Sequence, residues 1–150
     1  MKINLGCGKR KLPGYINVDN RKEVEPDILC DVSKGLPWDA NSVDEIVAID
    51  LIEHLTGLDV INLMNEIHRV LKPGGLFYHR TPSTDGRGAF QDPTHKSFWN
   101  INTWRLYFSD PAYRELYGTN ANFKIKQLFD TVTDPENKII HTQCLYEAIK

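Results

Sequence analysis

The feature that most constrains the fold is an amphipathic helix enclosed between two apolar segments. Residues 45–50 are nearly all apolar, as expected for a strand that is buried on both faces of a sheet. Residues 59–71 carry apolar side chains at helical spacing on one face, and Lys-Pro-Gly-Gly at 72–75 ends that helix. The next strand is expected at residues 75–81. This order of elements predicts an α/β fold with a largely parallel sheet.

Further short elements precede and follow this unit. The β-rich runs near the start of the chain are bounded by glycines and acids, and a turn signal at residues 134–137 separates two alternating segments near its end. The chain is therefore expected to end in an antiparallel hairpin. Residues 82–99 show little periodicity and are expected to form a long functional loop. The remaining expected elements are strands at 2–5, 15–19, 27–31, 123–132 and 139–149, and short helices at 100–108 and 111–118.

Length, charge and cysteine content restrict the functional class. The chain has 150 residues, which fits one domain that spans residues 1–150. Its net charge of −2 provides no overall basic field for nucleic acid. Cys7, Cys30 and Cys144 are odd in number and far apart, which predicts reduced thiols in a cytoplasmic protein. No apolar run reaches about 18 residues, and the first residues do not form a signal peptide, so no membrane partner is expected.

Small and acidic residues recur where the first four predicted strands end. Gly6-Cys7-Gly8 follows the first strand, where glycine permits a tight turn and the close approach of a ligand. Asp19, Asp31 and Asp50 close the second, third and fourth strands. One such acid is usually a helix N-cap or a solvated turn, but four successive strand ends indicate a ligand site at one sheet edge. There Asp19 can accept hydrogen bonds from both hydroxyls of a ribose, and Asp31 from an adenine amino group.

Two phosphate-binding alternatives fit this pattern poorly. A dinucleotide fingerprint would need glycine where Lys11 stands, and its acid would follow about 20 residues on, whereas Asp19 follows Gly8 much sooner. The chain also lacks a P-loop. A sulfonium cation with one adenosine and no phosphate suits a site surrounded by carboxylates better. An NAD or nucleotide-sugar enzyme of similar architecture stays open as an alternative.

In combination, these motifs resemble those of class I S-adenosylmethionine-dependent methyltransferases. The most recognisable part is the helix followed by Leu-Lys-Pro-Gly-Gly and a strand. Asp92-Pro93-Thr94-His95 resembles a loop of an uncharacterised, type 11-like subgroup of these enzymes. The resemblance covers roughly residues 3–99. Besides that loop, its matching segments are 4–8, 14–19, 31–38, 41–46, 53–55 and 66–76.

The resemblance implies a Rossmann-like fold, with a doubly wound, mostly parallel seven-stranded sheet and an antiparallel C-terminal hairpin. It also implies S-adenosyl-L-methionine as the cofactor and methyl transfer as the reaction. The implied cofactor-binding residues are Leu5 of the first motif; Gly6, Cys7 and Gly8, under the methionine part; Asp19 at the ribose; Asp31 and Val32 beside the adenine; and Asp50 near the methionine amino group.

The chain departs from the family pattern in three ways. The third glycine of the first motif is absent, and Asn4 stands where many members have an acid. The connection between Gly8 and Asp19 is too short for a full crossover helix. The cofactor is therefore expected to be exposed, unless a second subunit covers it in a homodimer. The alternative to an active enzyme is a non-catalytic module that binds the cofactor or a partner.

Two histidines are the candidates for chemistry at this site. Methyl transfer is an in-line displacement in which the protein mainly supplies orientation, and a base is needed only when the acceptor keeps its proton until attack. His54, after the fourth strand, and His95, in the long loop, can act as that base. Their structural alternatives are packing at a helix start for His54 and ordering of Asp92 or Thr94 for His95.

The acceptor class is inferred from motifs that the chain lacks. DNA amino- and cytosine-methyltransferases carry an Asp/Asn-Pro-Pro-Tyr/Phe motif or a Pro-Cys pair, and neither is present. Together with the net charge, this favours a small-molecule or sugar-like acceptor over nucleic acid. Because the histidines and cysteines lack zinc-ligand spacing, the sequence assigns no metal.

Overall fold

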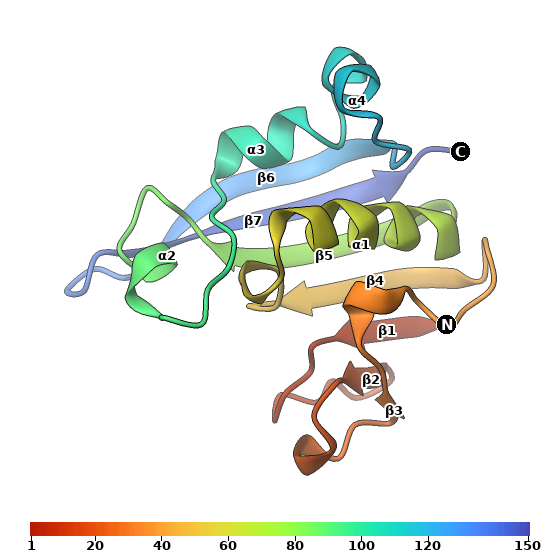
Figure 1. The fold of residues 1–150 in the computed structure, drawn as a ribbon, viewed down its shortest axis with the longest axis horizontal. Helices are drawn as coiled ribbons and strands as arrows, with labels where there is room; N and C mark the ends of the chain where they lie inside the picture. Colours follow the sequence, from red (N-terminus) through yellow and green to blue (C-terminus); the bar gives the residue numbers. More distant parts are fainter.

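A computed structural model of residues 1–150 contains one seven-stranded sheet with α-helices packed against it (Figure 1). The strand order is β3-β2-β1-β4-β5-β7-β6. Strands β1 to β5 pair in parallel, and β7 is antiparallel to both of its neighbours. The elements are β1 (Lys2–Leu5), β2 (Ile16–Asp19), η1 (Lys22–Val24), β3 (Ile28–Leu29), η2 (Val32–Lys34), β4 (Val43–Ile49), η3 (Ile52–His54), α1 (Gly57–Val70), β5 (Leu71–Pro82), α2 (Gly88–Gln91), α3 (Ile101–Leu106), α4 (Pro111–Tyr117), β6 (Phe123–Asp134) and β7 (Ile139–Ala148).

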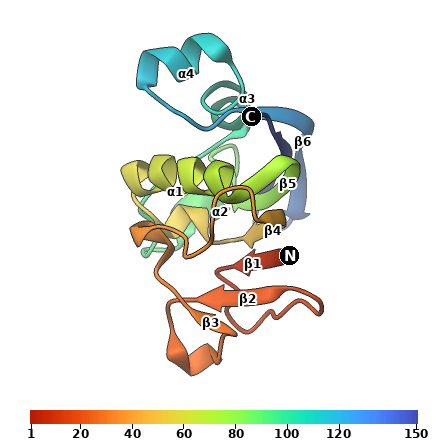
Figure 2. The same cartoon turned by 90° about the vertical axis from the view of Figure 1, so that its right-hand side faces the viewer.

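This arrangement confirms the predicted Rossmann-like sheet with its antiparallel C-terminal hairpin. The strand order reverses at β1, as in a doubly wound sheet, because β2 and β3 lie on one side of it and β4 and β5 on the other. Figure 2 shows α1, α3 and α4 on the same face of the sheet. The connections from β1 to β2 and from β2 to β3 contain no α-helix, so they leave the opposite face uncovered. We call this the open face.

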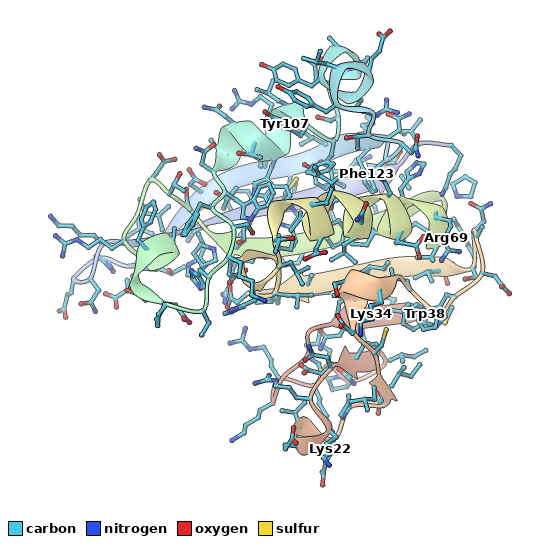
Figure 3. All side chains as sticks on the ribbon, viewed as in Figure 1. Lys22, Lys34, Trp38, Arg69, Tyr107 and Phe123 are labelled. Atoms are coloured by element: carbon cyan, nitrogen blue, oxygen red, sulfur yellow. The ribbon has the colours of Figure 1, made fainter.

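Helix α1 anchors the central strands and the segment before β4. The Thr56 hydroxyl caps its first turn by accepting from the backbone N–H of Asp59 at 3.2 Å. Its apolar side is buried against the sheet, as the helical periodicity predicted. At its end, the Arg69 guanidinium donates to the carbonyls of Trp38 and Leu36 at 2.9 and 3.0 Å, and Figure 3 shows Arg69 and Trp38 at the same end of the molecule. The helix therefore fixes the connection that leads into β4.

The open face is held by polar contacts between strands. Lys2 of β1 and Glu45 of β4 form an ion pair at 2.7 Å, and the Tyr15 hydroxyl also donates to Glu45. Across β5 and β7, the Tyr78 hydroxyl donates to Gln143 at 2.5 Å. Cross-strand pairs of this kind stabilise a sheet whose face is in water. The open face therefore carries polar side chains that pair with one another, at the surface that crossover helices cover in a complete doubly wound sheet.

Several elements differ in extent from the sequence prediction, and two of these differences have a clear structural reason. The third strand contains only Ile28 and Leu29, because Asp31 leaves the sheet and caps η2 through the N–H of Ser33 at 3.1 Å. The fifth strand begins at Leu71 rather than at residue 75, with an irregular register that includes the glycine turn. None of the helices has both the length and the hydrophobicity needed to cross a bilayer.

The core contains one histidine without hydrogen-bond partners. His79 of β5 is fully buried, and its ring centroid lies 4.1 Å from that of Trp104. Both ring nitrogens lack a partner. Burial lowers the pKa of His79 to about 3, because the protonated ring would lose its hydration without gaining a counter-charge. This imidazole is therefore neutral and is expected to lower the stability of the core.

Candidate active site

The carboxyl ends of the parallel strands meet at one edge of the sheet and surround a cavity of about 470 Å³. Gly6 lines it after β1, Asp19 at the end of β2, and Asp50 after β4. Asp31 and Val32 line it after β3. The structure thus brings together five residues that the sequence placed at the cofactor, for the expected reason that parallel strands end at a common edge.

The other predicted cofactor residues lie elsewhere. Cys7 and Gly8 line a neighbouring cavity of about 570 Å³, which shares Gly6, Arg21 and Asp50 with the first. The two cavities are therefore adjacent across the turn after β1. Leu5 lines neither cavity, because its side chain is fully buried in the hydrophobic core.

The turn at Gly6 depends on a neighbouring side chain as well as on its backbone. Gly6 has a φ of 63°, which favours glycine. A Cβ atom there would lie 2.7 Å from Cδ1 of Leu51, which itself lines the cavity. The sequence interpretation assigned the space beside this glycine to a ligand, but Leu51 fills it. Gly6 is thus required for this turn to pack against Leu51, and both residues form part of the cavity wall.

Asp19 is a buried carboxylate with three donors. Its Oδ2 accepts from the Gly8 N–H at 2.8 Å, and its Oδ1 accepts from the N–H and Nε of Arg21 at 3.0 and 3.2 Å. Burial alone would raise the pKa of Asp19, but the hydrogen bonds from Arg21 and Gly8 together outweigh it and lower that pKa. Asp19 is therefore ionised and links the end of β2 to the turn after β1.

The other two acids also have partners within the chain. The Asp31 carboxylate accepts from the hydroxyl of Ser33 at 2.7 Å, and the hydrogen bonds from Ser33 lower the pKa of Asp31. Asp50 pairs with Arg80, whose Nε lies 3.1 Å from Oδ1, and Nε2 of His141 lies 3.6 Å from the same oxygen. The wall of the 470 Å³ cavity is therefore less negative than the three aspartates alone suggested. The motifs gave no signal for these basic partners, because they face the acids only in the folded chain.

A cluster of one carboxylate and two imidazoles reaches the cavity through His54. His54 lines the cavity together with Thr94 and Lys96. His95 does not line it but packs edge-on against His54, with 5.0 Å between the ring centroids. One metal-ligating atom from each of Glu53, His54 and His95 lies within 4.8 Å of the other two. The structure thus brings the two predicted catalytic histidines together and adds a residue to which the sequence assigned no role.

Glu53 is the most deeply buried member of this cluster. It is 2% exposed, and its Oε2 accepts from the Thr81 hydroxyl at 3.1 Å. Burial raises the pKa of Glu53 to about 7. The sequence signal for a role of Glu53 was its position next to His54 in the Glu-His-Leu motif. Sequence spacing could not show that His95 lies beside it.

The loop that carries His95 is fixed to η3 by backbone hydrogen bonds. The N–H groups of Lys96 and Ser97 donate to the carbonyl of Glu53 at 2.7 and 3.2 Å. The Ser97 hydroxyl donates to the carbonyl of Ile52 at 3.3 Å. The predicted long loop is therefore ordered at the point where it meets the cavity.

The doubly wound strand order and the cavity at its carboxyl edge define a Rossmann-like, cofactor-binding α/β protein. Residues 4–79 match a family model described as a methyltransferase domain, which covers just over half of the chain. The chain belongs to this methyltransferase family, within the class I S-adenosylmethionine-dependent enzymes. Its cofactor is S-adenosylmethionine. No curated protein matches the sequence.

Solved structures share the fold at low sequence identity. A putative methyltransferase from Haloferax volcanii, solved in complex with the Trm112 methyltransferase activator, has a TM-score of 0.73 and 16% identity; the match covers 99% of this chain and 82% of that chain. An S-adenosylmethionine-dependent methyltransferase from Archaeoglobus fulgidus has a TM-score of 0.72 and 13% identity, with 97% and 85% covered. The [4+2]-cyclase SpnF has a TM-score of 0.71 and 12% identity, with 99% and 75% covered. These likenesses concern the fold alone.

Proposed function

We propose that this chain transfers the methyl group of S-adenosylmethionine to a small-molecule or sugar-like acceptor. The observation that carries the proposal is the composition of the 470 Å³ cavity. Gly6, Asp19 and Asp31 line the part formed by the strand ends, and His54 and Thr94 line the part formed by η3 and the long loop. One cavity thus offers groups for an adenosyl cofactor and polar groups for a second substrate.

The residues around the cavity fit the adenosyl cofactor. Each oxygen of a carboxylate can accept more than one hydrogen bond, so Asp19 can accept ribose hydroxyls while it holds the Gly8 N–H. Its other partner, the Arg21 side chain, is 62% exposed and can move aside. Asp31 and Val32 would flank the adenine, and Asp50 would lie at the methionine end. In this assignment Cys7 and Gly8 contribute to cofactor binding through the backbone of the turn that separates the two cavities.

In the transfer, the bond between sulfur and the methyl carbon breaks and its electron pair stays on sulfur. A new bond forms between the methyl carbon and a lone pair of the acceptor. An acceptor that still carries a proton must release it, and His54 is the group on the cavity wall that can take that proton. His95, which packs behind His54, would hold its ring in position or serve as the second base.

A second candidate function is a cofactor-binding module that works with a partner. It is favoured by the open face, where two crossover helices are missing, and by the Haloferax volcanii protein, which was solved with an activator. The polar contacts across the open face weigh against an obligatory cover at that surface. In one form of this second function the partner is another copy of the chain, which covers the cofactor in a homodimer.

We place the protein in the cytoplasm as one domain. Its three cysteines are free, and Cys7 and Cys144 are buried. Free thiols are typical of a reducing compartment. The seven strands form one sheet over one main hydrophobic core, which supports a single folding unit.

Calorimetric titration with S-adenosylhomocysteine and NAD, side by side, tests the cofactor assignment. We expect S-adenosylhomocysteine to bind and NAD not to bind. The variant Asp19→Asn should weaken that binding at least about 10-fold, because a charge-assisted hydrogen bond contributes about 1.5–3 kcal/mol. Asp39→Asn is the matched control, since Asp39 is exposed and lines neither cavity. Binding of NAD alone would refute the assignment.

Transfer of a tritiated methyl group to a panel of hydroxyl- and amine-bearing acceptors then separates the two candidate functions. Turnover by the isolated chain supports the enzyme. Turnover that requires an added activator protein supports the partner-dependent module.

A further inference from the structure

We infer that Glu53, His54 and His95 form a binding site for one divalent transition-metal ion, which holds a hydroxyl group of the methyl acceptor. The inference rests on the proposed function, because it assigns the metal to the acceptor side of the same cavity. Three donors of the right kind, one carboxylate and two imidazoles, lie within 4.8 Å of one another. Imidazole donors favour zinc and the later transition metals over magnesium, calcium and manganese.

The hydrogen bonds around both histidines leave one ring nitrogen of each free for a metal. Nδ1 of His95 lies 2.8 Å from the carbonyl oxygen of Ala89, which can only accept, so this nitrogen carries the proton. The Thr94 hydroxyl donates to Asp92 at 2.7 Å and therefore accepts from Nδ1 of His54 at 3.1 Å. Nε2 of each ring thus keeps its lone pair. Ligating histidines commonly have such a partner on their other nitrogen.

The carboxylate of the cluster is buried without a cationic side chain. Glu53 is 2% exposed, and the Thr81 hydroxyl is its side-chain donor. No lysine or arginine forms an ion pair with it. Buried carboxylates are normally paired with a cation or bound to a metal. A divalent ion between Glu53 and the two imidazoles would supply that charge.

The segments that carry the donors are already fixed to each other. The backbone N–H groups of Lys96 and Ser97 bond to the Glu53 carbonyl, so η3 and the His95 loop do not need to fold around an ion. Oδ2 of Asp92 lies 3.8 Å from Nε2 of His95 and can provide a further oxygen donor. This prior order lowers the entropic cost of binding.

A site with three protein ligands leaves coordination positions open to the acceptor. His54 lines the cavity, so those positions can be reached by an acceptor hydroxyl bound beside the cofactor. Coordination makes a hydroxyl group more acidic, and its proton passes to solvent. The oxygen then forms the bond to the methyl carbon as the bond from sulfur to that carbon breaks, which leaves a neutral thioether. In this arrangement the two histidines act as ligands, and the metal replaces an imidazole base.

Direct metal binding to the full chain tests the site without reference to turnover. Protein treated with a chelator is titrated with Zn²⁺ and Co²⁺ by calorimetry, and the visible absorption of Co²⁺ reports nitrogen ligands. We expect one ion per chain. His54→Ala and His95→Ala should each bind it at least about 10-fold more weakly, since even the removal of a residue that only supports a metal ligand has an effect of this size. His68→Ala is the matched control, because His68 lies on α1 and bonds to Ile149. Its affinity should equal that of the wild type.

A second measurement uses the unaltered chain, in case a variant fails to fold. Substoichiometric Co²⁺, which is paramagnetic, should broaden the NMR signals of His54 and His95 and leave those of His68 sharp. No saturable binding, equal affinity in the His54 and His95 variants, or uniform broadening overturns the metal site. If such a protein still binds S-adenosylhomocysteine, the proposed function stands. A chain that binds the metal but no S-adenosylhomocysteine contradicts the proposed function instead.

Discussion

Replacing His79 by leucine should stabilise the protein. The wild-type imidazole lies in the core with two unpartnered nitrogens, and an unsatisfied buried polar group costs about 1–3 kcal/mol. Leucine has no polar atoms to bury, but it packs less well against the Trp104 ring, at a cost below about 1.5 kcal/mol. The difference predicts a gain of about 1 kcal/mol in the free energy of unfolding at neutral pH.

The gain should increase in acid. In the unfolded chain His79 binds a proton below pH 6.5, whereas in the folded chain its pKa is about 3. Between these values the unfolded state binds more protons, so this histidine makes the wild type less stable as pH falls. Its contribution changes by about 1.4 kcal/mol per pH unit within that window. His79→Leu removes this dependence, so its advantage at pH 5 should exceed that at pH 7.5 by about 2 kcal/mol.

Urea unfolding at pH 7.5 and pH 5.0, followed by tryptophan fluorescence and circular dichroism, measures both values. His68→Leu is a suitable control at pH 7.5, because the His68 ring is hydrogen-bonded to the carbonyl of Ile149 and its loss should not stabilise the fold there. An advantage for His79→Leu that is the same at both pH values would refute the description of His79 as a neutral, unpartnered core residue. A destabilised variant at pH 5 would do so as well.

Two further predictions concern turns and anchors of the fold. Gly6→Ala should lower the free energy of unfolding by about 1–3 kcal/mol and weaken S-adenosylhomocysteine binding in calorimetry, because the new Cβ meets Leu51 at a strained φ. The control is Gly57→Ala, with no atom within 4 Å of its Cβ, which should leave binding unchanged and should not destabilise the fold. Arg69→Ala should cost about 1–3 kcal/mol in urea unfolding, because it releases the carbonyl of Trp38 and leaves the core contacts of α1 in place; unchanged stability would show that this anchor is dispensable.

Much of the fold could be predicted because its signals are local. Periodicity located α1 between two strands, and Pro73 with the glycines after it located the end of the helix. The alternation near the C-terminus located the hairpin of β6 and β7. The convergence of Gly6, Asp19 and Asp31 on one cavity was also predictable, since parallel strands deliver their carboxyl ends to one edge.

The sequence by itself determined the order of the elements and the strand ends that bear the cofactor residues. Only the tertiary structure decided which distant groups those residues face: the Gly8 N–H on Asp19, Arg80 on Asp50, and Leu51 beside Gly6. It also placed Leu5 in the core and brought Glu53, His54 and His95 together from two distant segments. Periodicity and turn chemistry act between near neighbours in the chain, whereas the contacts that set charge, burial and ligand geometry form between residues that meet only after the sheet has assembled.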